Sequence, residues 1–270
     1  MYKKIDDAYK YIFSHYSKPI DIAVILGSGL GPLANEIEVE TMIRYQDIPA
    51  FPVSTVKGHE GKLIIGTLNN KTILAMQGRF HYYEGYDMQD ITLPIRIFSR
   101  LGIQKLIITN ACGGIRDDLL PGDIVCITDQ ISLFCPSPLR GANLDDFGPR
   151  FKDMSEIYNK KAQQLLHEVA KKEDLVVKDG IYCFFKGPMF ESPAEIQAIK
   201  TIGGDLAGMS TVPEAIVARH CNMQTLGISL VTNKAAGLSH NELSHQEVVD
   251  TAKKAEHDLV KLMKGFIAVW

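Results

Sequence analysis

A short apolar run that leads directly into glycines, AVILGSGLGPL at residues 23–33, constrains the fold more than any other stretch. An apolar strand followed by a glycine-rich turn is typical of nucleotide- and phosphate-binding loops in α/β proteins. A dinucleotide fingerprint requires a further glycine three residues after Gly29, and Pro32 occupies that position. The loop therefore argues against a dinucleotide-dependent oxidoreductase and leaves a smaller anion as the ligand to consider.

Segments with strand spacing and segments with helix spacing alternate along the chain, and this alternation predicts the α/β class. We expect one domain over residues 1–270, with a central mixed β-sheet flanked by helices. The expected strands cover residues 22–26, 62–68, 71–77, 105–114, 122–131, 180–185 and 225–232. The expected helices cover residues 3–16, 88–100, 155–172, 192–203, 211–221 and 244–268.

Turn and capping residues refine this assignment. Asn69-Asn70 tolerates the positive φ of a tight turn and predicts a β-hairpin. Ser192 with Glu195, and Thr211 with Glu214, have the spacing of capping boxes at helix N-termini. Residues 133–153 are rich in Pro, Gly and Asp and predict one long surface loop, which is uncommon unless the loop is functional or held by a partner.

The composition is that of an ordinary soluble globular protein, with 46% apolar residues and a net charge of −3. A negative net charge gives no electrostatic basis for binding nucleic acid or an anionic membrane surface, so we expect neither partner. The five cysteines form no C-x-x-C pair, which favours a reducing compartment. The N-terminal segment has no signal-peptide pattern, and we expect a cytoplasmic protein.

Polar side chains follow the ends of several expected strands, where ligands bind in open α/β sheets. Arg79 and His81, in GRFHYYEGY, point the same way in an extended chain and can bind one anion together. Ser210 precedes the helix expected at 211–221, whose free N–H groups favour anions, and Ser28 lies in the glycine turn. These residues predict a site for one small, highly charged anion; an aromatic-rich loop with an incidental arginine is the alternative.

Seven segments, in this order, resemble the motifs of purine nucleoside phosphorylases of the trimeric class: GSGLG, GHEGKL, GRFHYYEGY, TNACGG, GPMFESPAE, GMSTVPE and SLVTNKAAG. The resemblance runs through nearly the whole chain and implies a nucleoside-phosphorylase-like fold. It also implies that a purine ribonucleoside or deoxyribonucleoside reacts with phosphate to give the base and the sugar 1-phosphate, in purine salvage. Inorganic phosphate is then a co-substrate, and no cofactor is expected.

The resemblance assigns roles to individual residues. It implies a phosphate site of Ser28, His59, Arg79, His81, Ser210 and the backbone N–H of Ala111. It implies a ribose site of Tyr83, Met209 and His245, and a base site of Phe190, Glu191, Asn233 and nearby Lys234. His81, Glu191 and Asn233 are the implied catalytic residues. Phe151, in the long loop, resembles the residue that reaches a neighbouring subunit's ribose pocket, so a homotrimer is expected.

The implied base site predicts specificity. Asn233 can hydrogen-bond purine N7 and O6, and ionised Glu191 can accept the N1–H that hypoxanthine and guanine carry and adenine lacks. Sites of this kind discriminate by roughly 10⁴-fold, so we expect inosine and guanosine to be preferred over adenosine. A 5′-methylthioadenosine phosphorylase is an alternative, although His245 suits a 5′-hydroxyl better than a methylthio group. A non-catalytic nucleoside-binding protein is another.

Two departures from the motifs leave the size of the base pocket open. Cys112 stands in TNACGG where Ala is common, and Met189 stands in GPMFES where a small residue is common. No base neighbours Cys112 in the sequence, so a packing role is expected rather than a nucleophilic one. His240 and His245 have no evident third ligand beside them, and no metal is expected.

Overall fold

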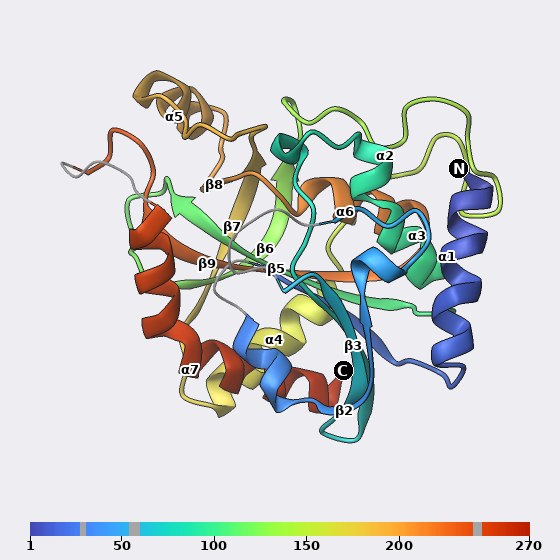
Figure 1. Ribbon diagram of the computed structural model, residues 1–270. Helices are drawn as coiled ribbons and strands as arrows, with labels where there is room; N and C mark the ends of the chain where they lie inside the picture. Colours follow the sequence, from blue (N-terminus) through green and yellow to red (C-terminus); the bar gives the residue numbers. More distant parts are fainter. Residues whose placement is uncertain (28–30, 54–59, 240–244) are drawn as a thin grey trace.

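The computed structural model of the protein describes residues 1–27, 31–53, 60–239 and 245–270, and one nine-stranded mixed sheet organises them (Figure 1). The strand order is β2-β3-β4-β1-β5-β8-β7-β6-β9, and β5 also pairs with β9. The strands are β1 (Ile22–Leu26), β2 (Glu38–Arg44), β3 (Lys62–Leu68), β4 (Lys71–Gln77), β5 (Lys105–Gly114), β6 (Ile124–Ile131), β7 (Val177–Phe184), β8 (Leu206–Gly208) and β9 (Gln224–Lys234).

The extra pairing of β5 with β9 closes part of the sheet into a ring. Within this ring β5 pairs with β8, β8 with β7, β7 with β6, and β6 with β9, which returns to β5. The strands β2, β3, β4 and β1 extend from β5 as an open wing. Because β4, β1, β5 and β9 are parallel to one another, their carboxyl ends meet at the same edge of the sheet.

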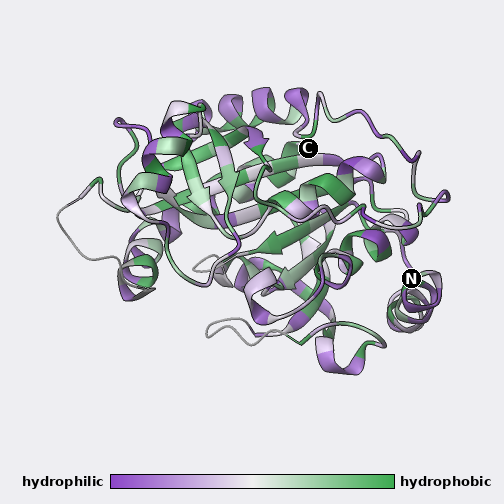
Figure 2. Cartoon of the chain, turned by 90° about the horizontal axis from the view of Figure 1, so that it is seen from above, coloured by the Kyte–Doolittle hydropathy of each residue, from purple (hydrophilic) through white to green (hydrophobic). Residues whose placement is uncertain are grey.

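Helices cover the sheet on two faces. One layer holds α1 (Tyr2–His15), α2 (Met88–Ile91), α3 (Leu93–Arg100) and α6 (Val212–His220), and the other holds α4 (Lys160–Lys172) and α7 (His245–Val269). The side chains of β1 alternate between the two cores, with Ala23 and Ile25 in the first and Val24 in the second. Figure 2 shows the hydrophobic residues gathered on the strands between the helices. The helix α5 (Pro193–Thr201) packs on a third, smaller core.

Most elements expected from the sequence are confirmed. Asn69 and Asn70 have φ of 50° and 62° and join β3 to β4 as an antiparallel hairpin. At α5 the side chain of Ser192 accepts from the backbone N–H of Glu195, whose carboxylate accepts from the N–H of Ser192, so this capping box is also confirmed. Between β6 and α4, residues 132–159 contain no helix or strand, as expected for the long loop.

Two expected helices differ in the structure, and two strands were missed. The helix expected over 88–100 is divided at Thr92, whose hydroxyl donates to the carbonyl of Met88. The helix expected from residue 155 begins only at Lys160, because the side chain of Asn159 accepts from the N–H of Ala162 and caps it there. The short strand β8 and the mostly exposed strand β2 were not expected at all.

A close approach of two backbones places Gly27, directly after β1, beside β5. A Cβ at Gly27 would lie 2.6 Å from the carbonyl oxygen of Thr109, so only glycine fits there without a shift. The N–H of Gly27 donates to the Thr109 hydroxyl at 3.1 Å. Among the described residues, no helix is both long and apolar enough to cross a membrane.

Candidate active site

A cavity of about 520 Å³ opens at the sheet edge where the parallel strands end. It takes residues from the segments that follow β1 and β4, from the ends of β5 and β9, and from the segment between β8 and α6. Its lining residues are Gly27, Arg79, His81, Tyr83, Glu84, Asn110, Ala111, Cys112, Gly113, Pro188, Phe190, Glu191, Ala207, Gly208, Met209, Ser210, Thr232, Asn233, Ala235 and Val248.

A buried ion pair fixes Arg79 at the wall of this cavity. The side chain is 2% exposed, and its Nε and Nη2 donate to Oε1 of Glu214 at 3.0 and 2.6 Å. Its Nη1 donates to the carbonyl oxygen of Thr109 at 2.7 Å. Glu214 lies in the first turn of α6 and is 4% exposed. The guanidinium plane is therefore set by contacts from α6 and from β5, not by solvent.

A second carboxylate orients His81. Oε1 of Glu84 accepts from the backbone N–H of His81 at 2.7 Å and lies 3.2 Å from the ring Nδ1. The imidazole also stacks on the ring of Tyr83, with centroids 4.7 Å apart. Burial lowers the pKa of His81, which favours a neutral imidazole at neutral pH, and burial raises the pKa of Tyr83 to about 12, which keeps its hydroxyl protonated.

The turn that carries Ser210 is strained and held by buried hydrogen bonds. Thr211 has φ of 71°, which is unusual for a β-branched residue, and its side chain does not cap α6. Its hydroxyl instead accepts from Nδ2 of Asn110 at 2.9 Å, and the hydroxyl of Ser229 donates to Oδ1 of Asn110 at 2.9 Å. The backbone N–H of Ser210 donates to the Tyr182 hydroxyl at 3.3 Å. This network connects β5, β7 and β9 to the start of α6.

The cavity lining also contains a carboxylate, that of Glu191, and an amide, that of Asn233. Asn233 accepts from the Thr232 hydroxyl through Oδ1 at 2.9 Å and donates from Nδ2 to the carbonyl of Lys234 at 2.9 Å. Burial raises the pKa of Glu191. Phe190 and Cys112 also line the cavity, and burial raises the pKa of the Cys112 thiol to about 12, which fits a packing role.

The structure brings most of the predicted site residues to this one cavity: Arg79, His81, Tyr83, Ala111, Phe190, Glu191, Met209, Ser210 and Asn233 all line it. Ser28, His59 and the side chain of His245 lie outside the described residues. Phe151 is 91% exposed and lies outside the lining. Lys234 also lies outside it, because its ammonium donates to the carbonyls of Arg116 and Asp117. The geometry thus gives no support for a contact between Lys234 and the base.

Sequence reasoning missed what Glu214 and Thr211 do. Their spacing indicates a capping box, yet the Glu214 carboxylate binds Arg79 and the Thr211 side chain binds Asn110. The partner of Glu214 is 135 residues away along the chain, so no local pattern could show it. Glu84 and Thr232, which orient His81 and Asn233, are close to them in sequence and were missed because each acts on a predicted residue rather than on a ligand.

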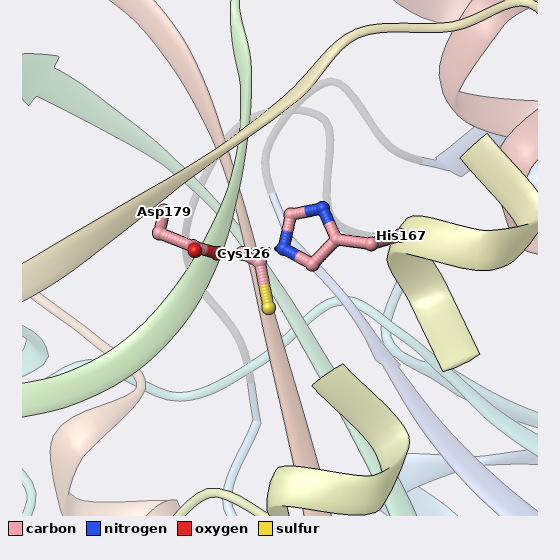
Figure 3. A group of neighbouring side chains, drawn as sticks. All are labelled: Cys126, His167 and Asp179. Atoms are coloured by element: carbon pink, nitrogen blue, oxygen red, sulfur yellow. Dashed lines mark hydrogen bonds and ion pairs between the residues drawn. The ribbon is translucent and has the colours of Figure 1, made fainter. Parts of the chain in front are cut away.

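One group of side chains elsewhere in the described part of the chain has the composition of a metal site. Cys126 in β6, His167 in α4 and Asp179 in β7 have ligand atoms within 4.8 Å of one another (Figure 3). However, Nε2 of His167 and Oδ1 of Asp179 are hydrogen-bonded at 2.7 Å, and Cys126 packs within the core beneath α4. Each side chain thus has a structural role, and no orphaned group there points to an ion.

Comparisons with known proteins identify the family. The model of the phosphorylase superfamily matches residues 21–268. Purine nucleoside phosphorylase 1 of Bacillus subtilis (strain 168) is 46% identical over 268 residues, which cover 99% of each chain. Isoform 2 of purine nucleoside phosphorylase from Schistosoma mansoni, in complex with cytosine and ribose-1-phosphate, has a TM-score of 0.93 and 42% identity over 99% of this chain and 96% of that one.

Two further solved structures are of purine nucleoside phosphorylase from Schistosoma mansoni. The complex with inosine has a TM-score of 0.94 at 34% identity and covers 99% of this chain and 96% of that one. The complex with adenosine has a TM-score of 0.93 at 36% identity and covers 98% of this chain and 96% of that one. The chain described here belongs to the purine nucleoside phosphorylases of the phosphorylase superfamily.

Proposed function

We propose that this protein catalyses the reversible phosphorolysis of purine nucleosides, with inorganic phosphate as co-substrate and no cofactor. The observation that carries the proposal is the placement of complementary groups in one cavity. Arg79, His81, Ser210, Glu191 and Asn233 all line this one cavity. The relatives support it, because their structures contain inosine or ribose-1-phosphate.

Phosphate is expected at the part of the cavity formed by Arg79, His81, Ser210 and the backbone of Ala111. Arginine donates to oxyanions through a planar fork of N–H groups, and the start of α6 adds N–H donors to the anion. Glu214 offsets the charge of Arg79, so this region provides oriented donors rather than a large net positive field. Phosphate held there can attack C1′ as the glycosidic bond breaks.

The purine is expected beside Glu191 and Asn233. As the bond breaks, negative charge grows on the purine, and prealigned hydrogen-bond donors stabilise it without reorganisation. Ionised Glu191 can accept N1–H of a 6-oxopurine, whereas adenine would leave this partly buried carboxylate without a donor. Inosine and guanosine, with ribose or 2′-deoxyribose, are therefore the preferred substrates that we propose. Adenosine occupies the crystal of one relative, so selectivity must be measured as turnover and not as binding.

The sugar is expected between these regions, against Tyr83 and Met209. Both side chains line the cavity, and the sulfur of Met209 lies within 2.4 Å of the position that a Cβ of Gly187 would take. A side chain at position 187 would therefore collide with Met209, so glycine there leaves room for the thioether beside the cavity. An apolar wall that excludes water protects the oxocarbenium-like sugar from hydrolysis, so phosphate is the favoured nucleophile.

We also propose a homotrimer in which Phe151 completes the ribose pocket of a neighbouring subunit. A phenylalanine that is 91% exposed has no packing role within its own chain. It lies in the long 132–159 segment, which has no helix or strand to justify its length. We also propose that the protein acts in the cytoplasm, in purine salvage.

The proposed function is tested by incubating the protein with inosine, with and without phosphate. We expect hypoxanthine and ribose 1-phosphate to appear in equal amounts, and only when phosphate is present. Release of hypoxanthine and free ribose without phosphate would show a hydrolase instead. Binding of inosine without any release would show a non-catalytic nucleoside-binding protein.

Glu191→Gln should lower kcat/KM for inosine by at least about tenfold, because a hydrogen bond to a charged group contributes roughly 1.5–3 kcal/mol. The raised pKa of Glu191 adds a pH effect. Below that pKa the carboxyl is protonated and cannot accept N1–H, so wild-type kcat/KM should fall on the acid side. The variant should lack that part of the decline. An identical acid limb in both proteins would remove Glu191 from the base site.

Glu214→Asp should raise the KM for phosphate by about tenfold while the KM for inosine stays within about twofold. The substitution keeps the charge but shortens the side chain by one methylene, so Arg79 must move, and misplacement of about 1 Å can cost far more than this. Glu195→Asp is the matched control, because Glu195 caps α5 outside the cavity. Equal changes in both KM values would indicate general distortion of the site.

Phe151→Ala should raise the KM for inosine severalfold without lowering the thermal unfolding temperature of the subunit, because the exposed ring contributes little to its own chain. Mixing this variant with an Arg79→Ala variant should restore part of the activity, since hybrid trimers contain sites with both intact residues. Sedimentation checks the assembly state. No recovery in mixed trimers would place Phe151 outside the active sites.

A further inference from the structure

A second cavity, of about 330 Å³, lies apart from the active site and shares none of its lining residues. It is formed where the start of α1 meets α2, α3 and the 138–144 part of the long loop, at the side of the molecule that carries the N-terminus in Figure 1. Its lining residues are Met1, Tyr2, Gln89, Arg96, Pro138, Leu139, Arg140, Ala142, Asn143 and Leu144.

Arg96, in α3, is a buried cation without a counter-ion among the described residues. It is 6% exposed, and its buried Nη1 has no hydrogen-bond partner there. The guanidinium contacts the face of Phe147, with Cζ 5.4 Å from the ring centroid. Such a cation–π contact compensates only part of the cost of removing a guanidinium from water. Burial accordingly lowers the pKa of Arg96.

Arg79, the buried arginine of the active site, shows which contacts Arg96 lacks. Arg79 is 2% exposed and has a carboxylate at 2.6 Å and a carbonyl at 2.7 Å. Arg96 is buried to a similar degree, yet no acidic residue lines its cavity. A second arginine, Arg140, also lines the cavity. A buried charge without a partner is strongly destabilising, so the unpaired charge of Arg96 indicates a partner from outside the chain.

We propose that this cavity binds a small oxyanion, a carboxylate or a phosphate-type group, with Arg96 as its main ligand and Arg140 at its mouth. A guanidinium fork matches either group through paired N–H donors. Pro138, Leu139 and Leu144 give the cavity apolar walls, and its volume falls within the range of small-molecule sites. The ligand is therefore a small organic acid or phosphate ester, with a short apolar body beside the anionic group.

A small ion fits the position of Arg96 better than an acidic side chain of a neighbouring subunit does. The guanidinium lies inside a hollow and is 6% exposed, so a flat partner surface would reach it only with a long projecting side chain. An ion of a few atoms needs no such projection. The helices α2 and α3 follow directly after the GRFHYYEGY segment, which carries Arg79 and His81. A ligand in the second cavity would therefore contact residues that are close in sequence to the active-site loop.

Thermal unfolding of the full chain in sodium sulfate and in sodium acetate, each compared with sodium chloride of equal ionic strength, tests this site. Sulfate stands for phosphate-type groups and acetate for carboxylates. A ligand that binds only the folded state raises the unfolding temperature. In Arg96→Met, the increase in unfolding temperature caused by at least one of the two anions should be smaller by about 2 °C or more. This is the size expected for loss of one weakly occupied site in a chain of this length.

Two further variants make the result decisive. Arg100→Met removes a more exposed charge from the same helix and should keep the full increment. Arg96→Lys keeps the charge and should keep part of it. In chloride alone, Arg96→Met should be at least as stable as the wild type, because it removes an unpaired buried cation. The active site contributes equally to all of these proteins.

Equal sulfate and acetate increments in wild type and Arg96→Met would overturn the proposal. Equal increments together with a smaller assembly of Arg96→Met in sedimentation would instead assign an acidic side chain of a neighbouring copy as the partner of Arg96. A loss confined to the acetate increment would identify carboxylates as the ligand class, and a loss confined to the sulfate increment would identify phosphate-type groups.

Discussion

The buried ion pair of Arg79 and Glu214 is the contact on which the active site depends. It joins the segment after β4 to the first turn of α6, across 135 residues of sequence. Two buried charges recover their desolvation cost only when their geometry is complete, so this pair tolerates little displacement of either element. The carbonyl of Thr109 supplies a further acceptor from β5. The part of the cavity where we propose that phosphate binds is therefore held by contacts from both the sheet and α6.

The start of α6 meets two requirements at once, and the strain at Thr211 reflects this. The turn must present Ser210 to the cavity while Glu214, one turn later, points to Arg79. A positive φ at a β-branched residue costs free energy, and it persists only when surrounding contacts determine it. Here those contacts are the hydrogen bonds of Asn110 and Ser229, both buried within the sheet. The strain is confined to Thr211, which lies between Ser210 and Glu214 in the sequence.

Sequence reasoning succeeded at two places where the cause of a structure is local. Asn69-Asn70 formed the expected hairpin and Ser192 the expected capping box, because each acts on neighbours within a few residues. The same pattern failed at Thr211, because the side chains of Thr211 and Glu214 bind residues that are distant in sequence. The edge strand β2 was missed because its exposed residues show no apolar alternation. The cavity residues themselves were recognised through motifs, whereas the residues that orient them had no signal of their own.

The hydrogen bonds of Asn233 explain how one amide can serve the departing base without rearranging. Its Oδ1 accepts from Thr232 and its Nδ2 donates to the carbonyl of Lys234. An amide nitrogen carries two N–H groups, so the second can donate to purine N7 while the first keeps its backbone partner. The Thr232 contact fixes which end of the amide faces the base. The N–H donor of Asn233 is thus aligned before negative charge develops on the base. Because Thr232 and Lys234 both lie in β9, this alignment does not depend on the ligand.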